Sequence, residues 1–191
     1  IKELKAFPLA YPEPHYKGIE RYITLVRVET EEGLGGWGEC IAQFRESALA
    51  TKVIIEEGFA PLLTGENVLD TERLWQKMID RIWWYGPEGI AAFATSAVDM
   101  ALWDAKGKAL GVPVYQLLGG KVNDKVIAMA SFIFDMDDFG WTINEFRWLR
   151  EQGYQMVKAG WGMHPDALFG QNREADIEIV RRVRKAIGEK L

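Results

Sequence analysis

The segment "GIAAFATSAVDMALWDAKGKALG", residues Gly89 to Gly111, decides how the first part of this chain folds. Apolar side chains occupy most of the circumference of a helix of this length, which predicts a helix buried on nearly all sides. Gly111 and Pro113 should end it, because glycine favours the left-handed conformation that often follows a helix and proline cannot continue one. We therefore expect a central helix around which the neighbouring elements pack.

Two further helices are expected upstream of the central helix. The first should begin at Ser47, whose hydroxyl can cap its amino end, and should run to about Glu57. Asp70 or Thr71 can cap the second. The second helix repeats apolar residues every four positions, which predicts that one stripe of it faces a core. These residues are Leu74, Met78 and Ile82.

Residues 1 to about 40 follow the pattern of β-strands. "RYITLVRVET" (Arg21–Thr30) is rich in β-branched side chains, "EEGLGG" supplies turn glycines, and "GWGEC" resumes an extended segment. We expect an antiparallel meander of three strands. "AYPEPHYKG" (Ala10–Gly18) contains two prolines, so it is expected to be a projecting loop between the first two strands and not regular structure. Three strands followed by three helices predict an α+β domain over residues 1–120.

The order of elements changes after residue 120 to strand, helix, strand, helix. Near-continuous apolar strands, each followed by an amphipathic helix, are typical of a parallel sheet covered by helices. The expected elements are Lys125–Phe134, Ile143–Gly153, Tyr154–Trp161 and Arg173–Lys190. A closed barrel of eight such units takes about 250 residues, and residues 121–191 hold only two such units. Because two parallel strands leave both sheet edges unpaired, we expect either a fragment or a chain that something else completes.

Composition excludes several classes of protein. The 191 residues are 48% apolar and 27% charged, which is typical of a folded globular chain. The net charge of −5 argues against a nucleic-acid partner. Cys40 is the only cysteine, which excludes an internal disulfide and fits a reducing compartment, so a cytoplasmic location is expected. No apolar run approaches the roughly 18 residues of a membrane span, so no membrane association is expected.

Three motifs resemble one known family. "SAVDMALWDAKGKALGVPVYQLLGG" (Ser96–Gly120) is the most specific, and "GWGEC" and "GYQMVKAGWG" (Gly153–Gly162) match in order and spacing. Together they resemble the enolase superfamily, in particular the mandelate racemase and muconate lactonizing enzyme group. The resemblance implies an α+β capping domain at residues 1–120 and, at residues 121–191, the first two β/α units of a TIM-type barrel, an incomplete barrel. It also implies abstraction of a proton next to a carboxylate with the help of Mg²⁺.

Lys158 is the candidate catalytic residue. Burying an unpaired ammonium is costly, so a lysine inside the apolar run Gly153–Gly162 is either paired or points out of the strand end into a site. Many members of the family that the chain resembles carry Lys-x-Lys at this strand end, the first lysine near the substrate carboxylate and metal, the second acting as a base. Here Lys158 matches the first lysine and Gly160 stands at the base position. The resemblance therefore implies an electrostatic role for Lys158, unless it is a surface lysine paired with a nearby acid.

The missing second lysine bears on the reaction. It disfavours a racemase that works with two bases and favours a single base from later in the barrel, as in the dehydration of a sugar acid. We therefore expect an acid-sugar dehydratase, with a racemase or epimerase as the alternative, and a member without activity is also open. The resemblance places three carboxylate metal ligands at the ends of later strands, beyond Leu191. No residue here is assigned to the metal, so Mg²⁺ is expected in the intact parent and the 191-residue chain itself is expected to be inactive.

Substrate-binding residues are implied in three loops. Relatives close two capping-domain loops over the barrel mouth; here these correspond to Ala10–Gly18 and Ile41–Ser47, and a third loop follows the second barrel strand. For each side chain, an ordinary exposed or packed role is the alternative. The candidates are Tyr11, His15 and Tyr16 in the first loop, Phe44 and Arg45 in the second, and Trp161 and His164 in the third.

The expected partners follow from the same reasoning. The substrate should be a small carboxylate, a sugar acid, for which His15 or Arg45 would be suited. The cluster "WWYG" (Trp83–Gly86) is expected to pack between domains or subunits, and a homo-oligomer is expected. The competing hypothesis is a non-catalytic binding or dimerisation module.

Overall fold

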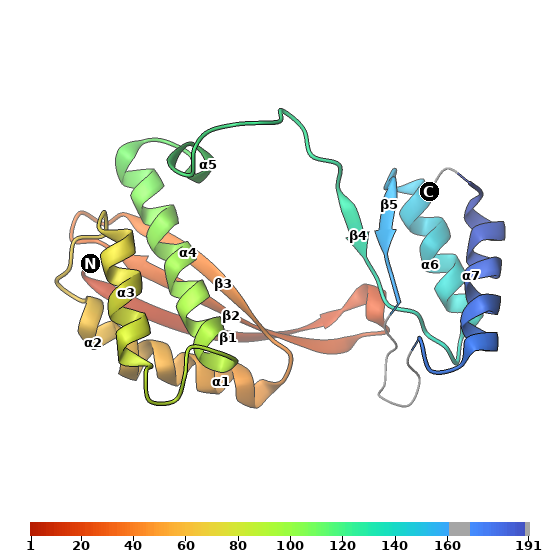
Figure 1. The fold of residues 1–191 in the computed structure, drawn as a ribbon, viewed down its shortest axis with the longest axis horizontal. Coiled ribbons are helices and arrows are strands. Elements are labelled where there is room, and N and C mark those ends of the chain that lie inside the picture. The colour runs from red at the N-terminus through yellow and green to blue at the C-terminus, as the bar shows by residue number, and fades with distance from the viewer. Residues whose placement is uncertain (161–168, 190–191) are drawn as a thin grey trace. The chain divides into compact units, whose positions relative to one another are not determined.

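The structure, a computed structural model, describes residues 1–160 and 169–189 (Figure 1). It consists of two compact units. The first comprises Ile1–Glu13 and Ile19–Val122, and the second comprises Asn123–Leu191 together with the short segment Pro14–Gly18. Among the helices described, none has the length and apolar character needed to cross a membrane.

The first unit is built on an antiparallel meander of β1 (Glu3–Glu13), β2 (Ile19–Glu29) and β3 (Gly35–Ala42), as the sequence predicts. In the register, Val26 of β2 lies opposite Ala6 of β1 and Gly38 of β3. One face of this sheet is covered by helices (Figure 1). The buried side chains on that face belong to alternate residues along each strand, as the pleat requires.

The prediction that Ala10–Gly18 is a loop is wrong for its first half, because β1 and β2 stay paired as far as Glu13 and Ile19. Pro12 of the predicted loop fits in β1, as does Pro8 before it, because β1 is an edge strand. The backbone N–H of Ala6 donates to the Glu56 carboxylate (3.0 Å) and not to β2. Pro8 and Pro12 lie two and six residues after Ala6, so their backbone nitrogens face the same side of the strand as that of Ala6, away from β2. The hydrogen-bond ladder with β2 therefore needs no N–H from either proline. The remaining residues, Pro14–Gly18, form the hairpin tip, which begins with a 3₁₀ turn.

The helical part of the first unit begins earlier than predicted. Helix α1 starts at Arg45 and not after Ser47, whose hydroxyl donates to the carbonyl of Phe44 (2.8 Å) instead of accepting a backbone N–H. Helix α1 ends at Val53, but helical backbone continues past Glu57, through the wider turns of η2 and into the short helix α2. The bounds are α1 Arg45–Val53, η2 Ile54–Phe59, α2 Ala60–Leu63, α3 Thr71–Arg81, α4 Ile90–Leu110 and α5 Val114–Leu117.

Helices α3 and α4 have the burial that their patterns predict. Leu74 and Met78 of α3, with Ile82 just after it, are fully buried. Helix α4 is buried along most of its length and ends at Gly111, which has the left-handed conformation expected of a helix-terminating glycine (φ 69°). The predicted central helix is therefore confirmed.

Helix α4 lies unusually close to β3, because both elements present small residues where they meet. A Cβ atom at Gly36 would lie 2.0 Å from the carbonyl oxygen of Ala101, and one at Gly38 would lie 1.9 Å from that of Ala97. Asp104 of α4 stabilises the same contact, because its carboxylate accepts a hydrogen bond from the backbone N–H of Trp37 in β3 (2.7 Å). The two glycines in "GWGEC" are thus needed for the packing of the central helix.

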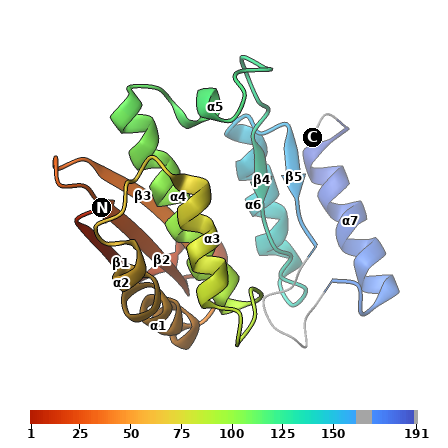
Figure 2. The ribbon, with the colours of Figure 1, turned by 60° about the vertical axis from the view of Figure 1, so that its left-hand side comes forward.

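The second unit follows the predicted order of strand, helix, strand, helix. It contains β4 (Met129–Ser131), α6 (Phe139–Glu151), β5 (Met156–Lys158) and α7 (Arg173–Ile187). The strands pair in parallel, with Ser131 opposite Lys158. Helices α6 and α7 pack against them (Figure 1, Figure 2). The core side chains are Ala130, Phe132 and Phe134 from β4 and the residues after it, Phe146 and Leu149 from α6, and Ile179, Val183 and Ile187 from α7.

Both strands are shorter than predicted. Apolar residues at the start of the predicted strand Lys125–Phe134 lie outside the ladder, and Val126 is 87% exposed. In the part of the chain that the structure describes, β4 and β5 each have one neighbouring strand, so ordered pairing is confined to three residues. The apolar pattern shows which residues are suited to burial, but it does not show how many neighbouring strands are present to bury them.

Candidate functional site

Lys158 is the last residue of β5 and therefore lies at the carboxyl end of the parallel pair. Its carbonyl oxygen accepts from the backbone N–H of Phe132 (2.8 Å), which fixes the strand end next to β4. Its side chain is exposed. Two residues later, Gly160 supplies no side chain, so no second ammonium group stands at that position.

Tyr16 of the hairpin tip lies against the same strand end. Its hydroxyl donates to the carbonyl oxygen of Ser131 (2.9 Å), the residue opposite Lys158 in the ladder. Its ring stacks on Phe132, with ring centroids 5.9 Å apart. The structure thus brings a predicted substrate-binding residue to the strand pair that holds the predicted catalytic residue.

His15 of the tip binds helix α6. Its Nδ1 atom lies 2.9 Å from Oε2 of Glu145, and its ring stacks on Trp148 with centroids 4.2 Å apart. These contacts occupy one ring nitrogen and one ring face. A substrate contact of His15 stays a prediction, and it would have to use the remaining nitrogen.

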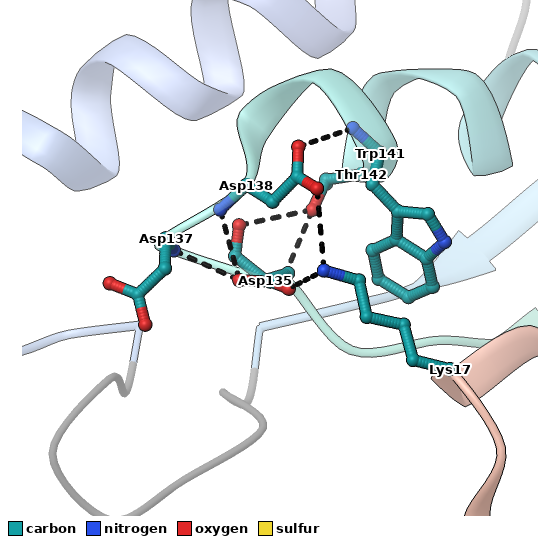
Figure 3. Close-up of polar contacts among 6 residues, drawn as sticks. All are labelled: Lys17, Asp135, Asp137, Asp138, Trp141 and Thr142. Carbon is teal, nitrogen blue, oxygen red and sulfur yellow. Dashed lines mark hydrogen bonds and ion pairs between the residues drawn. The ribbon is translucent and has the colours of Figure 1, made fainter.

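Lys17 makes the third contact of the tip, which the sequence did not reveal (Figure 3). Its Nζ atom lies 2.5 Å from Oδ2 of Asp135 and 3.3 Å from Oδ2 of Asp138, both in the segment between β4 and α6. It also lies 5.0 Å from the centre of the Trp141 ring, a cation–π distance. The available signal was "FDMDD", three carboxylates directly after a strand whose carboxyl end should face the tip.

Asp135 is held in place by its own segment as well as by Lys17. Its Oδ1 atom accepts from the backbone N–H groups of Asp137 (2.9 Å) and Asp138 (3.0 Å). Its backbone N–H donates to the hydroxyl of Thr142 (2.9 Å). The side chain is 10% exposed. Asp138 in turn caps α6 by accepting from the backbone N–H of Trp141 (2.9 Å). We refer to Asp135, Asp138, Trp141 and Thr142 as the tip socket.

The electrostatics of the tip socket favour the charged forms. Burial pushes the pKa of Asp135 up, but the hydrogen bond from Lys17 and those from two backbone N–H groups outweigh it, so this pKa falls below the ordinary 3.8. The N–H of Trp141 is the main cause of the lowered pKa of Asp138. The hydrogen bond to Asp135 raises the pKa of Lys17 above its ordinary 10.5. All three groups are therefore ionised at neutral pH.

We predict that Lys17→Met will raise the pKa of Asp135, because the substitution removes the cation and leaves burial unopposed by it. In the unsubstituted protein, the stabilisation from Asp135 should be complete above 3.8, its ordinary pKa, and should be lost as the pH falls through the lower folded value. Carboxyl ¹³C chemical shifts followed by NMR against pH will measure both pKa values. An Asp135 pKa that is equal in the two proteins would show that Lys17 does not contribute to its shift.

The described residues do not fit a metal ion. Within residues 1–160 and 169–189, no group of three or more His, Cys, Asp or Glu side chains is arranged to hold one. The carboxylate of Asp135 is engaged by Lys17 and by backbone N–H groups, so the acidic segment after β4 forms a site for an ammonium group. The assignment of metal ligands to later strands stays a prediction.

The other predicted residues lie elsewhere in the chain. Tyr11 belongs to β1 in the first unit and lies opposite Arg21, with 38% of the residue exposed. Phe44 and Arg45 stand at the start of α1 in the same unit, both exposed. Trp161 and His164 lie outside the described residues. Their substrate contacts stay predictions.

Comparisons with known proteins agree on one family. Residues 17–119 match the family described as "Mandelate racemase / muconate lactonizing enzyme, N-terminal domain". A D-galactonate dehydratase family member from Streptomyces bingchenggensis is 37% identical over 148 residues, which are 75% of this chain and 34% of that protein. D-galactarolactone cycloisomerase from Agrobacterium fabrum is 30% identical over 169 residues, covering 86% of this chain and 41% of that protein.

Solved structures give the same result. The crystal structure of the 3,6-anhydro-D-galactonate cycloisomerase from Zobellia galactanivorans matches with a TM-score of 0.85 and 30% identity. The match covers 100% of this chain and 49% of the other. The chain thus spans about half the length of this solved relative and less than half of the two curated relatives.

Proposed function

Because this chain belongs to the mandelate racemase / muconate lactonizing enzyme family, we propose that the protein containing it abstracts the proton next to the carboxylate of a sugar acid. We further propose that it is an acid-sugar dehydratase. The observation that supports this most directly is the end of β5, where Lys158 is followed two residues later by glycine. One ammonium group and no second lysine suit a reaction that breaks one C–H bond and expels a hydroxyl group.

The chemistry explains why a lysine is useful at this strand end. A proton next to a carboxylate is very weakly acidic, so its removal requires fixed positive charge where the enolate oxygens develop. The ammonium of Lys158, an exposed residue at the carboxyl end of the parallel pair, would supply such a charge. The hydroxyl of Tyr16, bound to the carbonyl of Ser131, would form part of the wall beside it.

Mg²⁺ is proposed as the cofactor of the whole protein, because members of the enolase superfamily use one or two Mg²⁺ ions to stabilise the enediolate. Its ligands are expected at the ends of later strands of the barrel, and the roles proposed for Lys158 and Tyr16 do not depend on them. The cytoplasmic location and the homo-oligomeric state also stay predictions.

A cycloisomerase is the second candidate, since two of the similar proteins carry that name. Both reactions begin with a polarised carboxylate, so the roles proposed for Lys158 and Tyr16 would be unchanged. A racemase or epimerase is less favoured, because a two-base mechanism lacks its usual second lysine at the end of β5.

A screen of the full-length protein against sugar acids and their lactones with Mg²⁺ tests the proposal. A dehydratase should yield a 2-keto-3-deoxy acid, which semicarbazide converts to an ultraviolet-absorbing product. In D₂O, exchange of the hydrogen next to the carboxylate with neither loss of water nor a keto product would indicate an epimerase. Ring opening of a lactone or anhydro sugar acid to a product of the same molecular formula, with or without a keto group, would indicate a cycloisomerase. Absence of turnover and exchange across the panel, in a folded protein loaded with Mg²⁺, would favour the non-catalytic module.

A further inference from the structure

Lys17 has a backbone conformation that its residue type does not favour. Its φ angle is 55°, and within the described residues it is the single non-glycine residue with a positive φ. Gly18, which follows, has φ 74°. Asparagine or glycine usually occupies such a position in a tight turn, because a Cβ atom is crowded there. The turn itself therefore gives no reason for a lysine, and the reason must lie in the side chain.

The side chain of Lys17 reaches two carboxylates that other residues also hold in position. Asp135 is oriented by two backbone N–H groups and by Thr142, and Asp138 is oriented as the cap of α6. The carboxylate of Asp135 is nearly buried, and Lys17 supplies the cation that compensates it. The partners lie more than one hundred positions apart in the sequence, so the pair restrains chain segments that are distant in sequence.

We propose that Lys17 is a positioning residue that locks the hairpin tip, Pro14–Gly18, into the tip socket at the carboxyl end of β4. The tip is then a fixed wall and not a mobile lid. Three consecutive side chains hold it: His15 on α6, Tyr16 on β4, and Lys17 in the socket.

The lock has a consequence for the neighbouring strand end. Tyr16 precedes Lys17 directly, so seating Lys17 also seats the Tyr16 hydroxyl on the carbonyl of Ser131, opposite Lys158. The locking of the tip does not depend on what the protein catalyses. Its effect on substrate binding does rest on the proposed function. The locking of the tip and its effect on substrate binding are therefore tested by separate measurements.

The test of the lock is the backbone order of residues 15–17, measured by ¹⁵N relaxation on the 191-residue chain. In the unsubstituted protein we expect order parameters of about 0.85, the value for rigid backbone. Lys17→Asn should lower them below about 0.6, the range of flexible backbone, although asparagine suits the turn better than lysine does. Lys17→Arg keeps the charge and can still bind both carboxylates, so it should preserve the order.

Three further variants make the test decisive. Asp135→Asn removes the charge from the other side and should loosen the tip as Lys17→Asn does, and the double variant should be no looser than either. Lys5→Met is the matched control, because Lys5 forms an exposed pair with Glu3 (2.6 Å) on β1 of the first unit. If Lys17→Asn leaves residues 15–17 rigid while its circular dichroism spectrum is unchanged, the turn and not the ion pair holds the tip, and the proposal is wrong.

The catalytic consequence is measured on the full-length protein once a substrate is known. Lys17→Asn should raise KM about tenfold while kcat changes less, because a loosened wall weakens ground-state and transition-state binding alike. Lys17→Arg should restore KM. A loosened tip with unchanged KM would overturn the link to the proposed site and leave the lock itself standing.

Discussion

Gly38→Ala is expected to destabilise the first unit by more than about 3 kcal/mol, the upper end of the usual cost of overpacking a core. The added Cβ atom would lie 1.9 Å from the carbonyl oxygen of Ala97 and 2.9 Å from the backbone nitrogen of Ala101. Both are main-chain atoms of α4, so no side-chain rotation can relieve the contact. Helix and sheet would have to separate, which would expose the apolar residues packed around them. Urea denaturation followed by circular dichroism will measure the loss.

Gly58→Ala is the matched control for this substitution. Gly58 lies in η2, has no positive φ, and has no atom within 4 Å of the position its Cβ would take. Alanine is the better helix former there, so the denaturation midpoint should stay the same or rise slightly. If Gly38→Ala instead had the midpoint of the unsubstituted protein, the close approach of α4 to β3 would not exist in solution.

The contact between α4 and β3 shows how much of the fold a sequence pattern contains. The length, burial and end of α4 followed from its apolar circumference and from Gly111. The glycines of "GWGEC" were assigned only to an extended segment, although Gly36 and Gly38 are two apart and Ala97 and Ala101 are four apart. Residues two apart lie on the same face of a strand, and residues four apart lie on the same face of a helix. The pairing was therefore present in the sequence, but only the structure shows which small residues meet.

The errors of prediction have a common physical cause. Whether Pro12 interrupts a strand depends on which side of β1 has a partner, and this is a property of the sheet and not of the residue. β4 is likewise limited to the three residues that pair with β5. Helix α1 starts at Arg45 without the side-chain cap that Ser47 was expected to supply. Local propensity gave the right type of element in these cases and the wrong bounds.

The candidate site was only partly predictable, because some of its contacts depend on the fold and not on local sequence. The motif around Lys158 led to a strand end, and the tip residues His15 and Tyr16 were named as candidates. The sequence does not single out Lys17, because its partners follow it by more than a hundred residues and nothing in its neighbourhood distinguishes it from a solvated lysine. Ion pairs between segments distant in sequence are defined by the fold alone.

Lys158→Ala in the full-length protein is expected to lower kcat by about 10²–10³-fold, the usual effect of removing one oriented group that stabilises developing negative charge. The ammonium lies at the carboxyl end of β5, and Gly160 offers no side chain to replace it. Because the Lys158 side chain is exposed, the thermal unfolding midpoint should be close to that of the unsubstituted protein. Steady-state kinetics on the sugar acid identified by the screen, together with a melting curve, will measure both effects.

Lys125→Ala is the matched control, because Lys125 is also exposed but precedes β4, at the opposite end of the same sheet from Lys158. Parallel barrels bind substrate at the carboxyl ends of their strands, so losing a charge at the amino end should leave kcat unchanged. Lys158→Arg separates charge from position, since it keeps a cation but spreads it over a planar group, and it should recover only part of the activity. A near-normal kcat for Lys158→Ala would remove this lysine from the mechanism, whereas equal losses in both alanine variants would point to the overall charge of the protein and not to the strand end.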